Sequence, residues 1–160
     1  MLILSPSNER IEPSQFSIFL AGSIEMGTAE DWQTQVIKSI TDNNVVFLNP
    51  RRTDWDSTWK QEITNPQFFE QVTWELDRLG NCDMIFLYLD PKTKSPISLL
   101  ELGLHAKSNK MIVCCPEGFY RKGNVDIVCK RNSIPIYDNL ENAIKALKNL
   151  VSLCSDEQSA

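Results

Sequence analysis

The sequence predicts one α/β domain, built as a three-layer sandwich around a five-stranded, mainly parallel β-sheet. Short apolar segments alternate along the chain with amphipathic ones, as expected when buried parallel strands are separated by helices. The length of 160 residues fits one domain, and the 42% hydrophobic and 23% charged residues are ordinary for a globular protein. No repeat or linker divides the chain. We expect the domain to cover residues 1–154, followed by a frayed tail at 155–160.

Five segments are expected to form strands because each is a short apolar run. Continuous apolar runs of this length are typical of strands that are buried on both faces of a parallel sheet. The expected strands are Ser17 to Ala21, Val45 to Leu48, Met84 to Leu89, Met111 to Cys115 and Ile134 to Tyr137.

Helices are expected where apolar residues recur at helical spacing between or after these strands. In the first helix, Trp32, Val36 and Ile40 lie on the inward face. Two long connections, 49–66 and 117–131, interrupt the alternation of strands and helices. The second is polar, and its sequence does not decide whether it contains a short helix. Connections of this length in a compact domain are usually functional or disordered, and the tryptophans of the first argue against disorder. The expected helices run from about Ala29 to Asn43, from Gln67 to Leu79, from Pro96 to Lys107 and from about Leu140 to Leu150.

Composition narrows the classes of function. The net charge is −5 without any basic run, which argues against a nucleic-acid polymer as partner, because phosphate backbones are bound by clustered Lys and Arg. No segment approaches the roughly 18 apolar residues of a membrane span, and the first apolar run is too short for a signal peptide. We therefore expect a cytoplasmic protein that does not bind membranes. The five cysteines are an odd number and form no CxxC pair, so we expect no metal site and no disulfide. We also expect no cofactor.

The helix expected from Pro96 to Lys107 carries one carboxylate, Glu101, among apolar residues. An ionised carboxylate on a buried apolar face is costly unless donors or an opposite charge compensate it, so helices rarely keep one for stability. Glu101 is therefore a candidate reactive group. The alternative is that Glu101 pairs with His105, one helical turn later, on a half-exposed face. The stripe that predicts burial has the spacing i, i+3, i+4 and i+7 and consists of Ile97, Leu100, Glu101 and Leu104.

A second carboxylate, Glu75, lies on a similar stripe of the preceding helix. The alternative is that Glu75 lies at the edge of that stripe and forms a salt bridge with Arg78 or with a basic loop. Two carboxylates in partly apolar settings suggest a nucleophile and a proton donor, because the environment can keep one ionised and the other protonated near neutral pH. The other members of this second stripe are Phe68, Val72 and Leu79.

Polar residues gather where the carboxyl ends of the predicted strands meet, which is where open α/β sheets bind ligands. A glycine and a serine after the first strand would let the backbone approach a ligand, and Ser95 would cap a helix whose N-terminus suits an anion. An arginine after the second strand could clamp a phosphate or carboxylate, and a tryptophan there could stack on a base. Each feature also has an ordinary structural explanation as a turn, a cap or a neutralised surface charge. The expected substrate-binding residues are Gly22, Ser23, Asn49, Arg51, Asp54, Trp55 and Ser95.

Four segments together resemble the nucleoside 2-deoxyribosyltransferase family, especially its divergent bacterial and phage-like branch. They are FLAGSIEMG, NPRRTDWD, WEL…CDMIFLYLDP and SPISLLELGLHA, and the resemblance extends from about Phe16 to Cys114. It implies a flavodoxin-like fold and exchange of the base of a 2′-deoxynucleoside through a glycosyl-enzyme intermediate. By match to the family motif, Glu101 is the expected nucleophile and Glu75 the acidic residue that meets the leaving base, although most relatives carry aspartate there.

The resemblance leaves the substrate and the acceptor open. Ser95 takes the position at which related deoxynucleoside-monophosphate N-glycosidases carry a phosphate-binding serine, and Arg51 is also compatible with a 5′-phosphate. The first expectation is transfer of 2-deoxyribose between a 2′-deoxynucleoside or deoxynucleotide and a free nucleobase, by a homo-oligomer. If water is the acceptor, the protein is a nucleotide N-glycosidase. A different class of answer is a nucleotide sensor or a TIR-like module, because such proteins also use flavodoxin-like domains.

Overall fold

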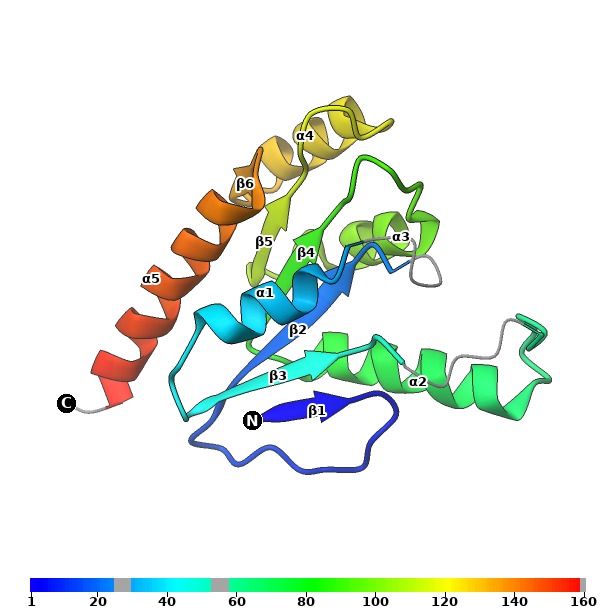
Figure 1. Ribbon diagram of the computed structural model, residues 1–160, viewed down its shortest axis with the longest axis horizontal. Helices are drawn as coiled ribbons and strands as arrows, with labels where there is room; N and C mark the ends of the chain where they lie inside the picture. Colours follow the sequence, from blue (N-terminus) through cyan, green and yellow to red (C-terminus); the bar gives the residue numbers. More distant parts are fainter. Residues whose placement is uncertain (25–29, 53–57, 159–160) are drawn as a thin grey trace.

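The computed structural model describes residues 1–24, 30–52 and 58–158 and confirms the α/β class. Its strands are β1 (Leu2–Leu4), β2 (Phe16–Gly22), β3 (Val45–Asn49), β4 (Met84–Tyr88), β5 (Met111–Cys114) and β6 (Ile136–Tyr137). They form one sheet in the order β1-β3-β2-β4-β5-β6, and every neighbouring pair is parallel (Figure 1). The sheet is therefore all-parallel and six-stranded, rather than mainly parallel and five-stranded as predicted.

The strand that the sequence analysis missed is β1, which lies at the edge of the sheet. It pairs with β3, with Leu2 opposite Phe47 and Leu4 opposite Asn49. Ile3 between them is buried, whereas Leu2 and Leu4 are exposed. Three residues are too few to show a periodic pattern, so pairing with β3 decides the conformation of this segment.

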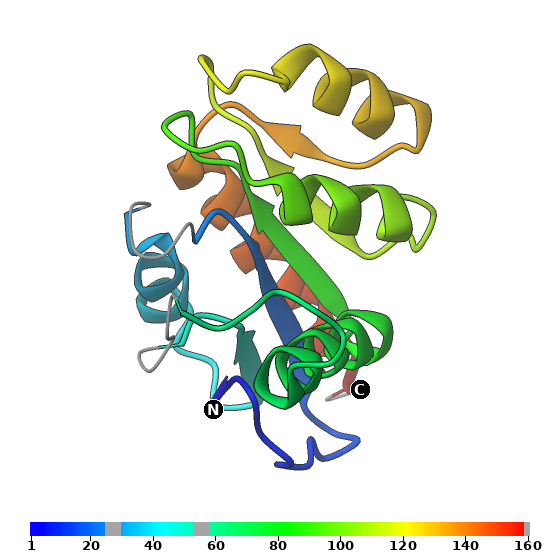
Figure 2. The ribbon, with the colours of Figure 1, turned by 90° about the vertical axis from the view of Figure 1, so that its right-hand side faces the viewer.

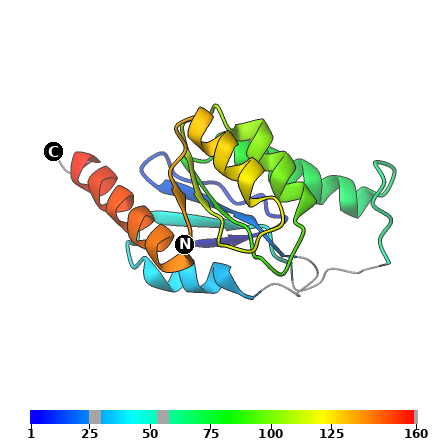
Figure 3. The ribbon, with the colours of Figure 1, turned by 90° about the horizontal axis from the view of Figure 1, so that it is seen from above.

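Helices cover both faces of the sheet (Figures 2 and 3). The arrangement confirms the flavodoxin-like three-layer sandwich. The expected short helix within 117–131 is present, and the last helix continues well beyond Leu150. No helix among the described residues is long and apolar enough to cross a membrane. The helices are α1 (Trp32–Ser39) and α5 (Leu140–Gln158) on one face, and α2 (Pro66–Asn81), α3 (Pro96–His105) and α4 (Lys122–Arg131) on the other.

The core is split by the sheet into two clusters. On the α1 and α5 face, the rings of Trp32 and Phe86 pack with their centroids 6.0 Å apart. On the α2, α3 and α4 face, Phe19 and Trp74 pack at 6.1 Å. Loops and helix N-termini come together at the carboxyl ends of these strands, which is where open α/β sheets bind ligands.

The strand order reverses at β2, which lies between β3 and β4. Such a reversal opens a crevice beyond the carboxyl ends of the strands, because the helices that follow leave toward opposite faces. Gly22 ends β2 here with a φ of +136°, and a Cβ atom at this position would lie 2.1 Å from the carbonyl oxygen of Tyr88. The next residue, Ser23, donates its backbone N–H to that oxygen at 2.9 Å. Close approach of β4 therefore requires glycine at position 22.

Candidate active site

The helix α3 turns Glu101 toward the protein interior, but its apolar stripe faces outward. Glu101 is 8% exposed, whereas Ile97, Leu100 and Leu104 are 61%, 58% and 58% exposed. The prediction that Glu101 is buried is confirmed, and the prediction that these three residues share its buried face is wrong. The helix meets the sheet through Leu102 and Ala106, which pack in the core, so the row that contains Glu101 lies at the edge of this contact.

The carboxyl group of Glu101 has no hydrogen-bond or ion-pair partner among the described residues. Burial, with a smaller contribution from the charge of Glu75, raises its pKa to about 8. Pairing with His105 is not observed: the pKa of His105 is lowered by burial and by Lys110, the opposite of what a carboxylate partner does. Glu101 is therefore an uncompensated buried acid, as expected of a reactive group rather than a structural one.

Glu75 lies on α2, partly buried, and near enough to Glu101 for the two carboxyl groups to repel each other. Burial raises its pKa, and a hydrogen bond from Gln71 Nε2 at 2.6 Å opposes that rise. The predicted alternative, a salt bridge to Arg78, is not formed. The Arg78 guanidinium instead donates to the backbone carbonyls of Ser7 and Glu9 at 3.1 and 2.7 Å.

The electrostatics of the two glutamates favour a shared proton. Both pKa values are raised, and each ionised group makes ionisation of the other harder. Between the two ionisation steps the pair carries one proton and one negative charge. Glu101 holds its proton up to about pH 8 in the absence of ligand. Near neutral pH Glu101 is thus the protonated member of the unliganded pair, so attack by Glu101 requires this proton to move.

Gln71 is a site residue that the sequence analysis missed. It is buried, and both of its lone-pair positions and both of its N–H groups are used. The oxygen accepts from the Ser5 hydroxyl and from Arg52 Nη1 at 3.3 Å, and the nitrogen donates to Glu75 and to the carbonyl of Pro50 at 3.4 Å. The available signal was its position one helical turn before Glu75.

Three buried hydroxyl groups meet at the carboxyl ends of β2 and β4. Ser23 Oγ lies 2.6 Å from Ser95 Oγ and 2.8 Å from Thr93 Oγ1, and the last two are 2.8 Å apart. The backbone of Asp90 adds an N–H donor to Ser23 at 2.8 Å and a carbonyl acceptor for Thr93 at 2.9 Å. Thr93 was not singled out in the sequence. The cluster ties the end of β2 to the start of α3 and so holds the helix that carries Glu101.

Ser95 occupies the N-cap position of α3, but its side chain makes no capping hydrogen bond. The residue is in the left-handed region at φ 45° and ψ 55°, and its hydroxyl turns toward the cluster instead. The expectation of an ordinary serine cap is therefore wrong. A non-glycine residue in this region is strained, and such strain is found where surrounding contacts determine the backbone, often at functional sites.

The segment after β3 reaches both faces of the sheet through adjacent arginines. Arg51 Nη1 donates to Gln33 Oε1 on α1 at 3.4 Å, and Arg52 donates to Gln71 on α2 and lies 5.0 Å from the centroid of the Trp59 ring. The buried side chain of Asn49 accepts the backbone N–H of Arg51 at 3.0 Å and shapes this turn. Two other expected binding residues, Asp54 and Trp55, lie outside the described residues.

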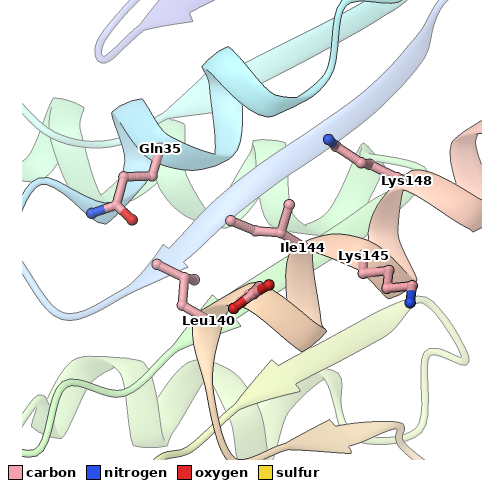
Figure 4. Close-up of a pocket in the computed structure, with 6 residues that line it drawn as sticks. Gln35, Leu140, Ile144, Lys145 and Lys148 are labelled. Carbon is pink, nitrogen blue, oxygen red and sulfur yellow. The ribbon is translucent and has the colours of Figure 1, made fainter.

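A hollow of about 460 Å³ lies on the opposite side of the sheet, between α1 and α5 (Figure 4). It does not adjoin the two glutamates, which belong to α2 and α3 on the other face, so it is not part of this site. No group of three or more His, Cys, Asp or Glu side chains within the described segments is placed to hold a metal ion. The hollow is lined by Gln35, Leu140, Glu141, Ile144, Lys145 and Lys148.

The site lies in the part of the chain that matches a known protein family. A protein-family model described as "Nucleoside 2-deoxyribosyltransferase like" matches residues 15–119, which include both glutamates and the hydroxyl cluster. Among solved structures, the chain is similar to a conserved protein from Enterococcus faecalis V583, with a TM-score of 0.61 and 12% identity, over 84% of this chain and 98% of that one. At this identity the likeness shows the fold alone. No curated protein matched the sequence.

Proposed function

We propose, because the chain belongs to the nucleoside 2-deoxyribosyltransferase-like family, that it transfers 2-deoxyribose between nucleobases through a covalent glycosyl ester on Glu101. The observation that carries the proposal is that Glu101 is buried and has no hydrogen-bond or ion-pair partner among the described residues. Its pKa is raised to about 8, and the pKa of the nearby carboxyl group of Glu75 is raised too. A structural role explains neither the burial nor the missing partner, because an uncompensated buried acid lowers stability.

In the proposed reaction, a carboxylate oxygen of Glu101 attacks C1′ of the deoxyribose. The N-glycosidic bond breaks with oxocarbenium-like character at C1′, and its electron pair goes to the base nitrogen, which takes a proton from Glu75. A second base then attacks C1′ and breaks the ester, which releases the Glu101 carboxylate. The proton lost by the incoming base returns to Glu75, so the pair is restored.

The proton must lie on Glu75 at the moment of attack, whereas the unliganded pair favours Glu101. Positive charge that develops at C1′ stabilises an ionised Glu101 more than an ionised Glu75, because Glu101 is the group that faces C1′ in the proposed complex. The proton therefore shifts within the pair as the bond breaks, and the total charge of the site is unchanged. The hydrogen bond from Gln71 keeps Glu75 oriented while its protonation state changes.

The experiment that tests the proposal is incubation of the protein with 2′-deoxyinosine and free adenine, followed by chromatographic separation of the products. We expect hypoxanthine and 2′-deoxyadenosine, and neither product from Glu101→Gln. We also expect adenosine to be a much poorer substrate than 2′-deoxyadenosine, because the family model that the chain matches is described by transfer of 2-deoxyribose. Absence of products from both nucleosides and their 5′-monophosphates would reject the proposal.

A second candidate function is hydrolysis of deoxynucleoside 5′-monophosphates, in which water replaces the incoming base. It is favoured by the partly exposed guanidinium of Arg51 beside the N-terminus of α1, since both attract an anion. We expect Arg51→Ala to lower kcat/KM by about ten- to hundredfold where a phosphate contact is lost. A loss confined to the monophosphates, with free sugar phosphate as product, would favour hydrolysis over base exchange.

We also propose that the protein is a homo-oligomer in which a second copy covers α3. The stripe of Ile97, Leu100 and Leu104 is exposed, and the only charged side chain from Pro96 to Leu104 is the buried Glu101. On the same face of the sheet, α2 also exposes two large apolar residues, Phe69 and Leu76. Charge-free apolar patches of this kind are rare on monomers and typical of interface centres. Light scattering should give a smaller particle for Leu100→Lys. Leu153→Lys on the opposite face of the sheet is the matched control, and a monomeric wild type would reject this interface.

A further inference from the structure

Arg52 is linked to Glu75 through one side chain, that of Gln71. The guanidinium Nη1 of Arg52 donates to Gln71 Oε1 at 3.3 Å, and the same amide donates through Nε2 to Glu75 Oε1 at 2.6 Å. Gln71 is 3% exposed, so little water reaches its amide. A cation on the segment after β3 is thus joined to the proposed proton donor on α2 by two consecutive hydrogen bonds.

The amide of Gln71 has two possible orientations, which differ by a half turn about its last bond. In one, the NH₂ group faces Glu75 and favours the ionised carboxylate. In the other, the carbonyl oxygen faces Glu75 and favours the protonated acid, which alone can donate a hydrogen bond to it. The orientation of this amide therefore decides which form of Glu75 is stabilised.

Two neighbours with a fixed hydrogen-bonding role select the first orientation. A guanidinium group only donates, so Arg52 requires the amide oxygen on its side. A backbone carbonyl only accepts, and that of Pro50 takes the N–H of Nε2 at 3.4 Å. The Ser5 hydroxyl also contacts the oxygen, but a hydroxyl accepts from an NH₂ group equally well and does not choose between the orientations. Of the side chains in these contacts, Arg52 alone disfavours the second orientation whether or not Glu75 is protonated.

The guanidinium group of Arg52 is itself held in place. It lies 5.0 Å from the centroid of the Trp59 ring, a distance at which a guanidinium and an indole ring attract each other. Arg51, the preceding residue, donates to Gln33 on α1 instead. Of these two adjacent arginines, Arg52 is the one whose described contacts lead to Glu75.

We propose that Arg52 is a positioning residue: by holding the oxygen of Gln71, it keeps the amide N–H directed at Glu75 and so favours the ionised form of that carboxyl group. This inference rests on the proposed function, in which Glu75 gives a proton to the leaving base. The hydrogen bond from Gln71 assists that step, because it stabilises the carboxylate that proton donation leaves behind. Without Arg52 the amide can turn, its oxygen accepts from the protonated acid, and Glu75 becomes a weaker proton donor.

Other charged groups also act on Glu75. Glu101 faces it from α3, and each of the two charges disfavours ionisation of the other. Arg78, on α2 itself, donates to backbone carbonyls of the segment before β2. Burial raises the pKa of Glu75, and the hydrogen bond from Gln71 opposes that rise. Loss of Arg52 should therefore raise this pKa further, in the same direction as loss of Gln71.

The test is carboxyl NMR titration of the ligand-free protein, with Glu75→Gln to assign the Glu75 signal. We expect the pKa of Glu75 to rise in Arg52→Met and in Gln71→Leu. If Arg52 acts through Gln71, adding Arg52→Met to Gln71→Leu should cause no further rise. Arg51→Met removes the same charge from the adjacent residue, so it is the matched control and should change the pKa much less.

Activity gives a second readout. The acid limb of kcat/KM for 2′-deoxyinosine should move to higher pH in Arg52→Met, because the pair must lose one of its two protons to become active. Arg52→Lys keeps a cation that only donates hydrogen bonds and should restore most of the wild-type position. A purely structural role of Arg52 predicts instead a lower melting temperature with an unchanged pKa of Glu75 and an unchanged limb.

The outcomes separate this inference from the proposed function. An unchanged pKa of Glu75 in folded Arg52→Met would overturn the inference and leave the proposed function standing. Equal rises in the wild-type and Gln71→Leu backgrounds would also overturn it, because Arg52 would then act through its charge alone. The expected titrations in a protein that turns over no nucleoside would reject the proposed function and, with it, the role of Arg52 in proton donation. Should Arg52→Met not fold, Arg52→Gln decides, because its amide donates or accepts and so permits both orientations of Gln71.

Discussion

The side-chain amide of Gln71 donates to the carboxyl group of Glu75 across 2.6 Å, and through the same nitrogen it also holds the carbonyl of Pro50. Its oxygen accepts from Ser5 and Arg52. Gln71 therefore connects Glu75, the proposed proton donor, to the segment that follows β3 and to Ser5, which follows the edge strand β1. The position of Glu75 depends on this connection, because no other hydrogen bond to its side chain is formed within the described residues.

Replacement of Gln71 should change the acid side of the activity profile. The bond from Gln71 lowers the pKa of Glu75, so Gln71→Leu removes that effect and the pKa rises further under burial. The low-pH limb of kcat/KM should move to higher pH, because the active form has lost one of the two protons of the pair. Gln67→Leu, exposed on the same helix, is the control. An unshifted limb would show that the bond does not tune Glu75.

Removal of the charge of Glu75 should lower the pKa of Glu101. Burial is the larger cause of the rise to about 8 and the Glu75 charge the smaller one, so in Glu75→Gln the pKa should fall but stay above its ordinary value. Carboxyl NMR titration measures the change, with Asp77→Asn on the same helix as control. Loss of the proton donor should also lower kcat by about 10²- to 10⁴-fold. A pKa that does not respond would mean that the two glutamates titrate independently.

Stability should depend on pH through Glu101. Its pKa is about 8 in the folded protein and near its ordinary value of 4.5 when unfolded, so the folded state binds the extra proton and stability falls as pH rises from about 4.5 to 8. The full shift corresponds to a loss of order 5 kcal/mol. Glu101→Gln should therefore exceed the wild type in unfolding free energy at pH 8 and match it near pH 4. Urea unfolding at both pH values, with Glu141→Gln as an exposed control, measures the difference, and parallel curves would contradict it.

The hydroxyl cluster should matter for folding and for the position of α3. Ser95→Ala keeps the left-handed backbone at φ 45° but removes the hydroxyl that meets Ser23 and Thr93. We expect a loss of about 1–3 kcal/mol in unfolding free energy, because two buried hydroxyl groups lose a partner. Ser152→Ala, on the exposed side of α5, should cost less than about 0.5 kcal/mol. Equal unfolding free energies of the two variants would contradict a structural role of the hydroxyl cluster.

Much of the fold was predictable because buried parallel strands leave a strong signal. Four short, continuous apolar runs form the central strands, and the helices between them lie close to the expected bounds. The apolar pattern could not predict β1, because its three residues form a strand only through their pairing with β3. The pattern also could not predict which way the apolar stripe of α3 faces. Ile97, Leu100 and Leu104 have the same helical spacing whether they pack in a core or lie on the surface.

The carboxylates of the site could be predicted from the sequence, whereas its uncharged polar side chains could not. Glu101 and Glu75 stand out because a charge among apolar residues is unusual, and the family motif points to the same residues. Gln71 and Thr93 carry no such signal, because an uncharged polar side chain on a helix or loop is ordinary until its burial is known. Their roles follow from contacts between segments far apart in the sequence, which periodicity does not encode.

The most direct test is intact-protein mass spectrometry of the protein after incubation with a 2′-deoxynucleoside and acid quenching. If Glu101 is the nucleophile, the wild type should gain the mass of one deoxyribosyl group, Glu75→Gln should gain it more slowly, and peptide mapping should place it on Glu101. Glu101→Ala should remain unmodified while keeping its fold, since removal of a buried unpaired charge is well tolerated. The same adduct on Glu101→Ala, or products formed by the wild type without any adduct, would contradict a covalent mechanism at this residue.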